Sequence, residues 1–147
     1  MISKAKIIMK AFRSGQTWEM INVLNSAIRG WANYHRHVCS KETFGYVDHC
    51  IFRNLIKWIR RRHPNKKWKW LRNHYFRNKG FRTWSFFASM RTTRGEFRTI
   101  DRLLASKIKI VRHAKIRSQA NPYDKNWQEY FQNRKIRKFP VGAFVYP

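Results

Sequence analysis

Residues 17–38 read TWEMINVLNSAIRGWANYHRHV, and this stretch predicts the core of the fold. Its apolar and aromatic side chains recur at alternating spacings of three and four residues, the period of one helix face. They are Ile21, Leu24, Ile28, Trp31, His35 and Val38. Thr17 is suited to cap this helix, and Glu19 lies in the first turn, where the helix dipole favours an acid. Gly30 interrupts the stripe, so we expect another backbone to pack closely there or the helix to kink.

A second helix is predicted directly after the first, over residues 40–63. Ser40 can cap it, and Glu42 lies in its first turn. Its apolar face consists of Phe44, Val47, Ile51, Leu55 and Trp58. The helix should end near His63, because Pro64 disfavours the helical conformation in the residue before it. Since very few residues join the two helices, we expect an antiparallel helical hairpin.

The pattern changes beyond Pro64. We expect a short basic-aromatic helix over residues 66–76 and a strand over residues 83–89. Phe97, Ile100 and Leu104 suggest a further short helix, and the alternation over residues 107–117 predicts a half-buried strand. The predicted turn and last helix follow over Asn121, Pro122, Tyr123, Asp124 (the cap), Trp127, Tyr130 and Phe131.

These elements predict a mainly α fold with a small β element, in which the helical hairpin is followed by a basic α+β segment. The expected division is a helical domain over residues 1–63, a basic nucleic-acid-binding segment over residues 64–134 and an irregular tail over residues 135–147.

Charge points to a phosphate-rich partner. The chain of 147 residues has 33 Lys and Arg against 7 Asp and Glu, a formal charge of +26. Self-repulsion at that density opposes compaction, and a polyanion relieves it. A 43% apolar and 16% aromatic composition nevertheless predicts a folded chain rather than a disordered basic tail.

The basic residues concentrate where acids are missing. From His49 to Gly95 there is no Asp or Glu, but there are fourteen Lys and Arg. The densest part reads RRRHPNKKWKW (residues 60–70). Its cations can neutralise phosphates, and its tryptophans can stack on unpaired bases. The alternative for any single Trp is a place in the core beneath a solvated charged face.

Metal, cofactor and catalytic sites are not expected. His35 with Cys39, and His49 with Cys50, could supply ligands, but they form no paired metal motif. The seven acids are scattered, and the sequence contains no phosphate-binding glycine loop. We therefore predict no catalytic residue, no metal and no cofactor.

Location is predicted from the cysteines and the apolar runs. The two cysteines form no disulfide framework, which fits a reducing compartment. The run from Ile7 to Met9 is too short for a signal-peptide core, and no apolar stretch approaches a membrane span. We expect a protein of the bacterial cytoplasm or an organelle matrix, with no membrane partner.

Several blocks of the sequence carry a family resemblance. They read LNSAIRGWANYHRH (residues 24–37), SKETF (40–44), RRHPNK (61–66), RHAKI (112–116), ANPYD (120–124) and WQEYF (127–131). In this order they resemble the maturase-specific domain of group II intron reverse transcriptases and the region that follows it. The resemblance implies a helical thumb (domain X) and a basic segment that, in relatives, helps contact DNA. It also implies a role in gripping intron RNA and helping it fold for self-splicing.

The resemblance and the basic cluster together define the expected contacts with nucleic acid. They are Arg29, Arg36, Lys57, Arg60, Arg61, Arg62, His63, Asn65, Lys66, Lys67, Lys69 and Arg72. The partner we expect is structured RNA of a group II intron, with target DNA as a further partner.

Departures from the family leave alternatives open. The polymerase motif Tyr-x-Asp-Asp and the nuclease cysteine pairs have no counterpart in the sequence. We therefore expect an RNA-binding splicing cofactor that is not catalytic by itself. The chain could instead be a split or truncated part of a reverse transcriptase, with a separately encoded polymerase half as partner. The third hypothesis is that the chain is a general basic nucleic-acid-packaging or ribosome-associated protein.

Overall fold

The computed structural model describes residues 1–38, 40–80, 82–93, 95–111 and 115–138, except the side chains of Arg82 and of residues 135–138. The chain forms two compact units, Met1–Arg112 and His113–Pro147. Within the described part, helices predominate and one small antiparallel sheet accompanies them, so the predicted fold class is confirmed.

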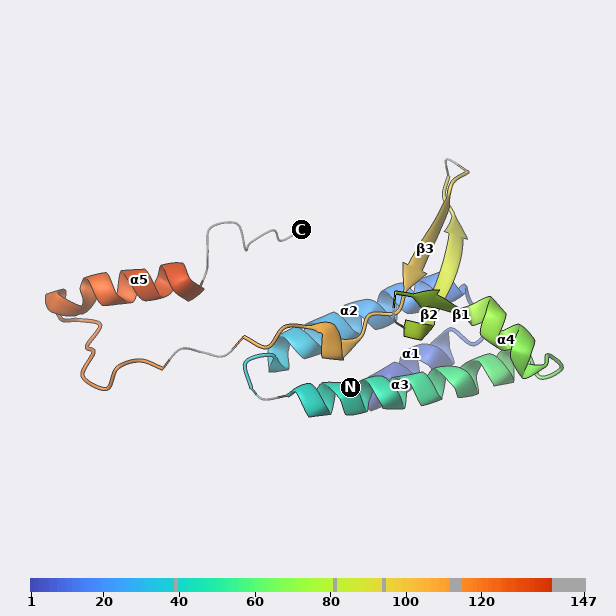
Figure 1. Cartoon of the computed structure of the whole chain (residues 1–147), viewed down its shortest axis with the longest axis horizontal. Coiled ribbons are helices and arrows are strands. Elements are labelled where there is room, and N and C mark those ends of the chain that lie inside the picture. Colours follow the sequence, from blue (N-terminus) through green and yellow to red (C-terminus); the bar gives the residue numbers. More distant parts are fainter. Residues whose placement is uncertain (39, 81, 94, 112–114, 139–147) are drawn as a thin grey trace. The chain divides into compact units, whose positions relative to one another are not determined.

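Three helices build the first layer of the larger unit. They are α1 (Ile2–Ala11), α2 (Thr17–His35) and α3 (Lys41–Arg62). In Figure 1, α2 and α3 run in opposite directions, as the predicted hairpin requires, and α1 contacts both. Helix α1 was not predicted. Ala5, Ile8 and Met9 are spaced three or four residues or one residue apart, so they lie on one side of the helix, and that side is buried. With only ten residues, the helix shows too short a pattern to be predicted.

The predicted apolar stripes of α2 and α3 form the core. Fully buried side chains include Ile21, Leu24 and Ile28 of α2, and Phe44, Ile51 and Leu55 of α3. The two helices also contact each other through aromatic rings: the centroids of Trp31 on α2 and Phe44 on α3 lie 5.2 Å apart.

The helix ends follow the sequence in part. Helix α3 has Ser40 at its N-cap position and His63 at its C-cap, as predicted. The cap of α2 is Gln16, so the prediction of Thr17 is wrong by one residue. The prediction of a close backbone at Gly30 is also wrong, because a Cβ there would meet nothing within 4 Å apart from its own helix.

The core continues past Pro64 into α4 (Trp68–Tyr75) and a three-stranded sheet. The strands β1 (Phe76–Lys79), β2 (Arg82–Arg91) and β3 (Phe97–Asp101) pair antiparallel in the order β1-β2-β3. Leu71, Tyr75 and Phe86 are buried with the helical core. The short helix and the strand predicted here are confirmed. The domain boundary at residue 63 stays a prediction.

The helix predicted through Phe97, Ile100 and Leu104 is wrong. Gly95, with φ of 81°, lies in the turn before β3, and Phe97 to Asp101 pair with Arg91 to Phe87 of β2. Beside an available partner strand, the aromatic and β-branched residues of this segment favour the extended form. Figure 1 shows β2 and β3 extending as a two-stranded arm away from the helices.

The strand predicted over residues 107–117 is also wrong for the residues described. After the 3-10 turn η1 (Ala105–Lys107), the chain runs on without a partner strand as far as Val111. Ile108 and Ile110 are half-buried between exposed neighbours, so the alternation was real. Its cause is an extended segment packed on helices: Lys41 Nζ donates to the Ile108 carbonyl at 3.0 Å, and Val111 N donates to the Arg36 carbonyl at 2.9 Å. Residues 112–114 lie outside the described part.

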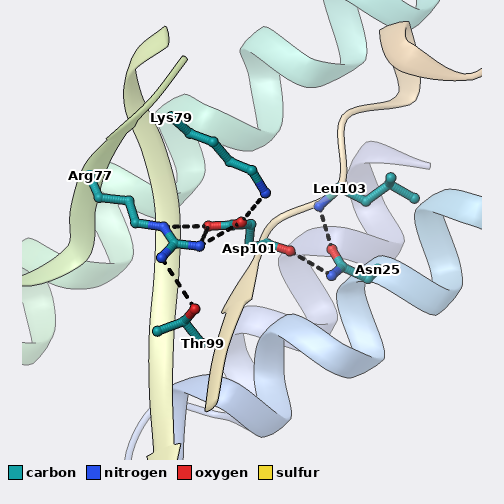
Figure 2. Close-up of polar contacts among 6 residues, drawn as sticks. All are labelled: Asn25, Arg77, Lys79, Thr99, Asp101 and Leu103. Atoms are coloured by element: carbon teal, nitrogen blue, oxygen red, sulfur yellow. Dashed lines mark hydrogen bonds and ion pairs between the residues drawn. The ribbon is translucent and has the colours of Figure 1, made fainter. Parts of the chain in front are cut away.

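One side chain of α2 binds the end of the sheet (Figure 2). Asn25 Nδ2 donates to the Asp101 carbonyl at 2.9 Å, and the Leu103 amide donates to Asn25 Oδ1 at 2.6 Å. On the other side, Arg77 Nε and Nη2 donate to the two carboxylate oxygens of Asp101 at 2.9 and 2.8 Å. Lys79 Nζ also donates to that carboxylate. Asp101 therefore joins β1, β3 and α2.

The smaller unit consists of the 3-10 turn η2 (Lys125–Trp127) and helix α5 (Gln128–Lys138). The predicted cap is confirmed at the turn, where the Asn126 amide donates to Asp124 Oδ1 at 3.0 Å. Helix α5 includes residues 135–138, which were expected to be irregular. The rest of the predicted tail, residues 139–147, lies outside the described part.

Candidate nucleic-acid interface

The outward face of α3 carries a row of cations. Because a helix turns once every 3.6 residues, Arg53, Lys57 and Arg60 share the face opposite Phe44 and Leu55. All three cations are exposed, and Arg61 is exposed beside them. The same face begins with exposed Tyr46 and His49, so its polar side is continuous over most of the helix.

Helix α4 continues the row. Arg60 links the two helices, because its guanidinium lies 5.5 Å from the centre of the Trp68 ring. The basic surface is defined here as the exposed cations of α3, of α4 and of the turn between them. They are Arg53, Lys57, Arg60, Arg61, Lys66, Lys67, Lys69 and Arg72. Seven of these eight were predicted as contacts, and predicted Asn65 is exposed in the same turn.

Two predicted contact residues turn toward the protein instead. Arg62 lies on the core side of α3, where its Nη1 donates to the Gly15 carbonyl at 2.7 Å and its guanidinium covers the Trp58 ring at 5.1 Å. His63 Nε2 and the Tyr75 hydroxyl form a hydrogen bond of 2.7 Å. Arg62 stabilises the packing of the α1–α2 connection on α3, and His63 stabilises the junction of α3 and α4. The contact of both residues with nucleic acid stays a prediction.

Two further predicted contacts, Arg29 and Arg36, lie on α2 and at its C-cap. Arg29 and Arg36 are exposed, but Arg36 follows the end of α2 and precedes α3. Helix α3 has 22 residues and is about 33 Å long, so Arg36, which precedes it, and Arg60, in its last turn, lie near opposite ends of it. The predicted residues exposed together on α3, α4 and the turn between them are therefore Lys57, Arg60, Arg61, Asn65, Lys66, Lys67, Lys69 and Arg72. Arg29 lies on a different helix, and Arg36 lies beyond the other end of α3.

The basic surface has no acid of its own. The sequence has none between residues 49 and 95, and the two least exposed acids bonded to other groups, Asp48 and Asp101, have partners away from this surface. Asp48, on the buried side of α3, accepts hydrogen bonds from the Ala105 and Ser106 amides, each at 3.0 Å. Partial burial by itself raises the pKa of Asp101, but the hydrogen bonds from Arg77 and Lys79 outweigh it and lower this pKa below its usual value. Asp101 is thus a charged structural partner of β1.

The aromatic residues divide between core and surface. Trp58 is buried and Trp68 is half-buried against Trp84 and Phe76, as the core alternative predicted. Trp70 is 39% exposed, and it is the aromatic of residues 60–70 that stays available for stacking.

Sequence reasoning missed Arg53 and Asn25. Arg53 could have been found, because it lies four residues before Lys57 and therefore on the same helix face. Asn25 was quoted only as part of a family block. A polar amide beside Leu24 and Ile28, on the buried side of a helix, was the available signal for a buried hydrogen bond.

The described residues contain no group of three or more His, Cys, Asp or Glu placed to hold a metal ion. None of the helices in the described part is both long and apolar enough to cross a membrane. The Cys50 thiol is free, and Cys39 lies outside the described residues.

The fold and surface define a small, strongly basic, mainly helical protein. Residues 1–76 match the family model of the group II intron maturase-specific domain. The match covers more than half of the chain and extends from α1 to the first residue of β1. The chain therefore belongs to the group II intron maturase-specific domain family, with a maturase-related role. A comparison with curated proteins finds no match.

Proposed function

We propose that this chain binds structured RNA of a group II intron and assists its folding and splicing. The observation that carries the proposal is the basic surface, which has eight exposed cations and no acid. This surface lies inside the region of the chain that matches the maturase-specific domain. RNA phosphates are the partner that such a surface favours most, because each contact also releases a condensed counterion.

The rigidity of the surface favours folded RNA over any strand of the same charge. Arg53, Lys57, Arg60 and Arg61 project from one helix whose opposite face is buried in the core. Their spacing is therefore fixed before RNA binds, and little conformational entropy of the backbone is lost on binding. A folded intron presents phosphates in a fixed arrangement as well. The protein offsets their repulsion, and the intron RNA performs the transesterification.

We also propose that the chain catalyses no step by itself. Two of its acids already have structural roles, buried Asp48 with backbone amides and half-buried Asp101 with Arg77 and Lys79. Neither carboxylate is free to act as a metal ligand or a general base without losing those hydrogen bonds. Primer extension with Mg²⁺ or Mn²⁺ on a primed RNA template is expected to yield no product from the purified chain.

Salt dependence tests the electrostatic mechanism. If about six phosphates are neutralised, log K for a folded intron should fall against log salt with a slope of roughly −4 to −5. The same preparation should accelerate splicing of a group II intron precursor at Mg²⁺ concentrations too low for efficient self-splicing. A nearly flat salt dependence, or no effect on splicing, would contradict the proposal.

A further inference from the structure

Helix α4 sorts its aromatic side chains onto two sides. Trp68 and Tyr75 point to the core, where Tyr75 stacks on Phe86 with centroids 5.8 Å apart and planes within 5°. Trp70 and His74, one turn apart, lie on the other side and are exposed. A single exposed Trp is common on protein surfaces and needs no explanation. A second aromatic ring aligned with it is a more specific feature.

The two exposed rings form a ladder that exists before any ligand binds. Trp70 and His74 stack with centroids 4.7 Å apart and an interplanar angle of 10°. Lys66 Nζ lies 5.4 Å from the centre of the Trp70 ring, and the His63 ring meets Trp70 edge-on at 5.2 Å. The contacts with His63 and His74 hold the indole in place, so a flat ligand that displaces the Lys66 ammonium from the ring and stacks there immobilises little additional side-chain freedom.

The surroundings of the ladder specify the ligand further. Lys66 lies over the Trp70 ring, Lys67 and Lys69 are exposed nearby in sequence, and no acid lies between residues 49 and 95 of the sequence. A ligand with a flat aromatic face and a nearby negative charge fits both features. A nucleotide provides both, because its base can stack while its phosphate meets a lysine. A base inside a paired helix is stacked on both faces, so only an unpaired base offers a free face.

We propose that Trp70 and His74 form a stacking platform for an unpaired nucleobase of the bound RNA, with a flanking phosphate on Lys66. This inference rests on the proposed function and deepens it: the basic surface holds paired segments by their phosphates, and the platform selects a place where a bulge or loop interrupts them. The platform contacts the flat face of the base, which all four bases have, so it should bind any of them.

The test compares two RNA duplexes of equal length at fixed salt, one fully paired and one with a central three-nucleotide bulge. Trp70→Ala should weaken binding to the bulged duplex about 10-fold, within the range for loss of one base–aromatic stack, and binding to the paired duplex less than about twofold. Trp70→Phe should retain most of the affinity, because it keeps a stacking ring. Tyr34→Ala, which removes an exposed aromatic ring from α2, is the matched control and should change neither affinity.

A fluorescent base gives a second measurement. With 2-aminopurine at the bulge, the wild-type chain should quench the fluorescence through stacking, and Trp70→Ala should not. Circular dichroism checks that each variant folds, as expected for an exposed position. Equal losses on both duplexes, or unchanged quenching in Trp70→Ala, would overturn the platform while leaving the proposed function in place. If the wild-type chain binds neither duplex, the proposed function is wrong and the platform with it.

Discussion

The Asn25 side chain connects α2 to the end of the sheet by two hydrogen bonds. Its amide supplies one donor and one acceptor, and both are used, by the Asp101 carbonyl and the Leu103 amide (Figure 2). These two backbone groups lie at the end of β3 and just beyond it, where the chain leaves the ladder with β2. Asn25 thus takes the place of a partner strand and orients the sheet on the helices.

Asn25→Ala should therefore destabilise the protein by about 1–3 kcal/mol, because it leaves two partly buried backbone groups without their partner. Chemical denaturation measures this loss. Asn22→Ala is the matched control: Asn22 is exposed on the same helix, so the variant carries the same change in helix propensity without the two hydrogen bonds. Equal stability of the two variants would contradict the role of Asn25.

His63 should make stability sensitive to mild acid. Burial, followed by the positive charges of Arg62, His74 and Lys66, lowers the pKa of His63 below its usual 6.5. The unfolded chain therefore binds the proton more readily than the folded one. Stability should fall as the pH drops from about 6.5 toward the lowered pKa of the folded state.

The melting temperature between pH 7 and pH 5 measures this effect. His63→Gln keeps a side chain able to hydrogen-bond with Tyr75 and removes the titration, so its melting temperature should depend less on pH than that of the wild type. His74→Gln removes a neighbouring imidazole and serves as the comparison. Identical pH profiles for His63→Gln and the wild type would show that His63 does not carry the effect.

For single residues of the interface, exposure to solvent was predictable from their charge. Lys57, Arg60 and Lys66 were expected to be exposed because few charged side chains are buried without a partner, and they are exposed. Arg62 was grouped with them, since three consecutive arginines look alike in sequence. Its position on the core side follows only from the spacing with Ile51 and Leu55, and its bond to Gly15 requires the packing of the α1–α2 connection on α3.

Among the elements, long helices were predictable and β3 was not. Helices α2 and α3 carry five or more apolar residues at helical spacing and end at clear signals such as Pro64. The segment from Phe97 to Asp101 has only five residues, and its form depends on a partner strand ten residues away. Helix α1 is stabilised mainly by the burial of Ala5, Ile8 and Met9, a tertiary effect that a ten-residue pattern does not reveal.

Asp48 attaches the end of the larger unit to α3. Besides the two amides of η1, its carboxylate lies 3.7 Å from Arg102 Nη1, and both side chains are buried. Asp48→Ala should cost about 3–5 kcal/mol, because it removes a buried charge partner and the acceptor of two backbone amides. Glu42→Ala, an exposed acid in the same helix, should cost less than about 1 kcal/mol. Hydrogen exchange at the Ala105 and Ser106 amides should accelerate in Asp48→Ala, and unchanged protection would contradict this role.

The whole molecule combines a net charge of +26 with a well-buried apolar core. Charge and composition were sufficient to predict a folded, basic protein, and the motif blocks were sufficient to predict the family. How the cations divide between α2, α3 and α4 was not predictable, because it depends on which face of each helix is buried. Eight of them are exposed on α3, α4 and the turn between these helices, the basic surface. The central claim is that this surface, rather than total charge, recognises folded intron RNA.

One measurement tests that claim most directly: the affinity of two charge-matched double variants for a folded group II intron and for an unstructured RNA of equal length. Lys57→Ala/Arg61→Ala removes two cations from the basic surface, and Lys4→Ala/Lys6→Ala removes two exposed cations from α1. Both variants lose the same net charge, so any general electrostatic effect is the same. We predict that the α3 variant loses about 10-fold or more on the folded intron and much less on the unstructured RNA, while the α1 variant changes both only slightly. Equal losses for the two variants, or equal losses on the two RNAs, would contradict the account and favour a general nucleic-acid-packaging protein.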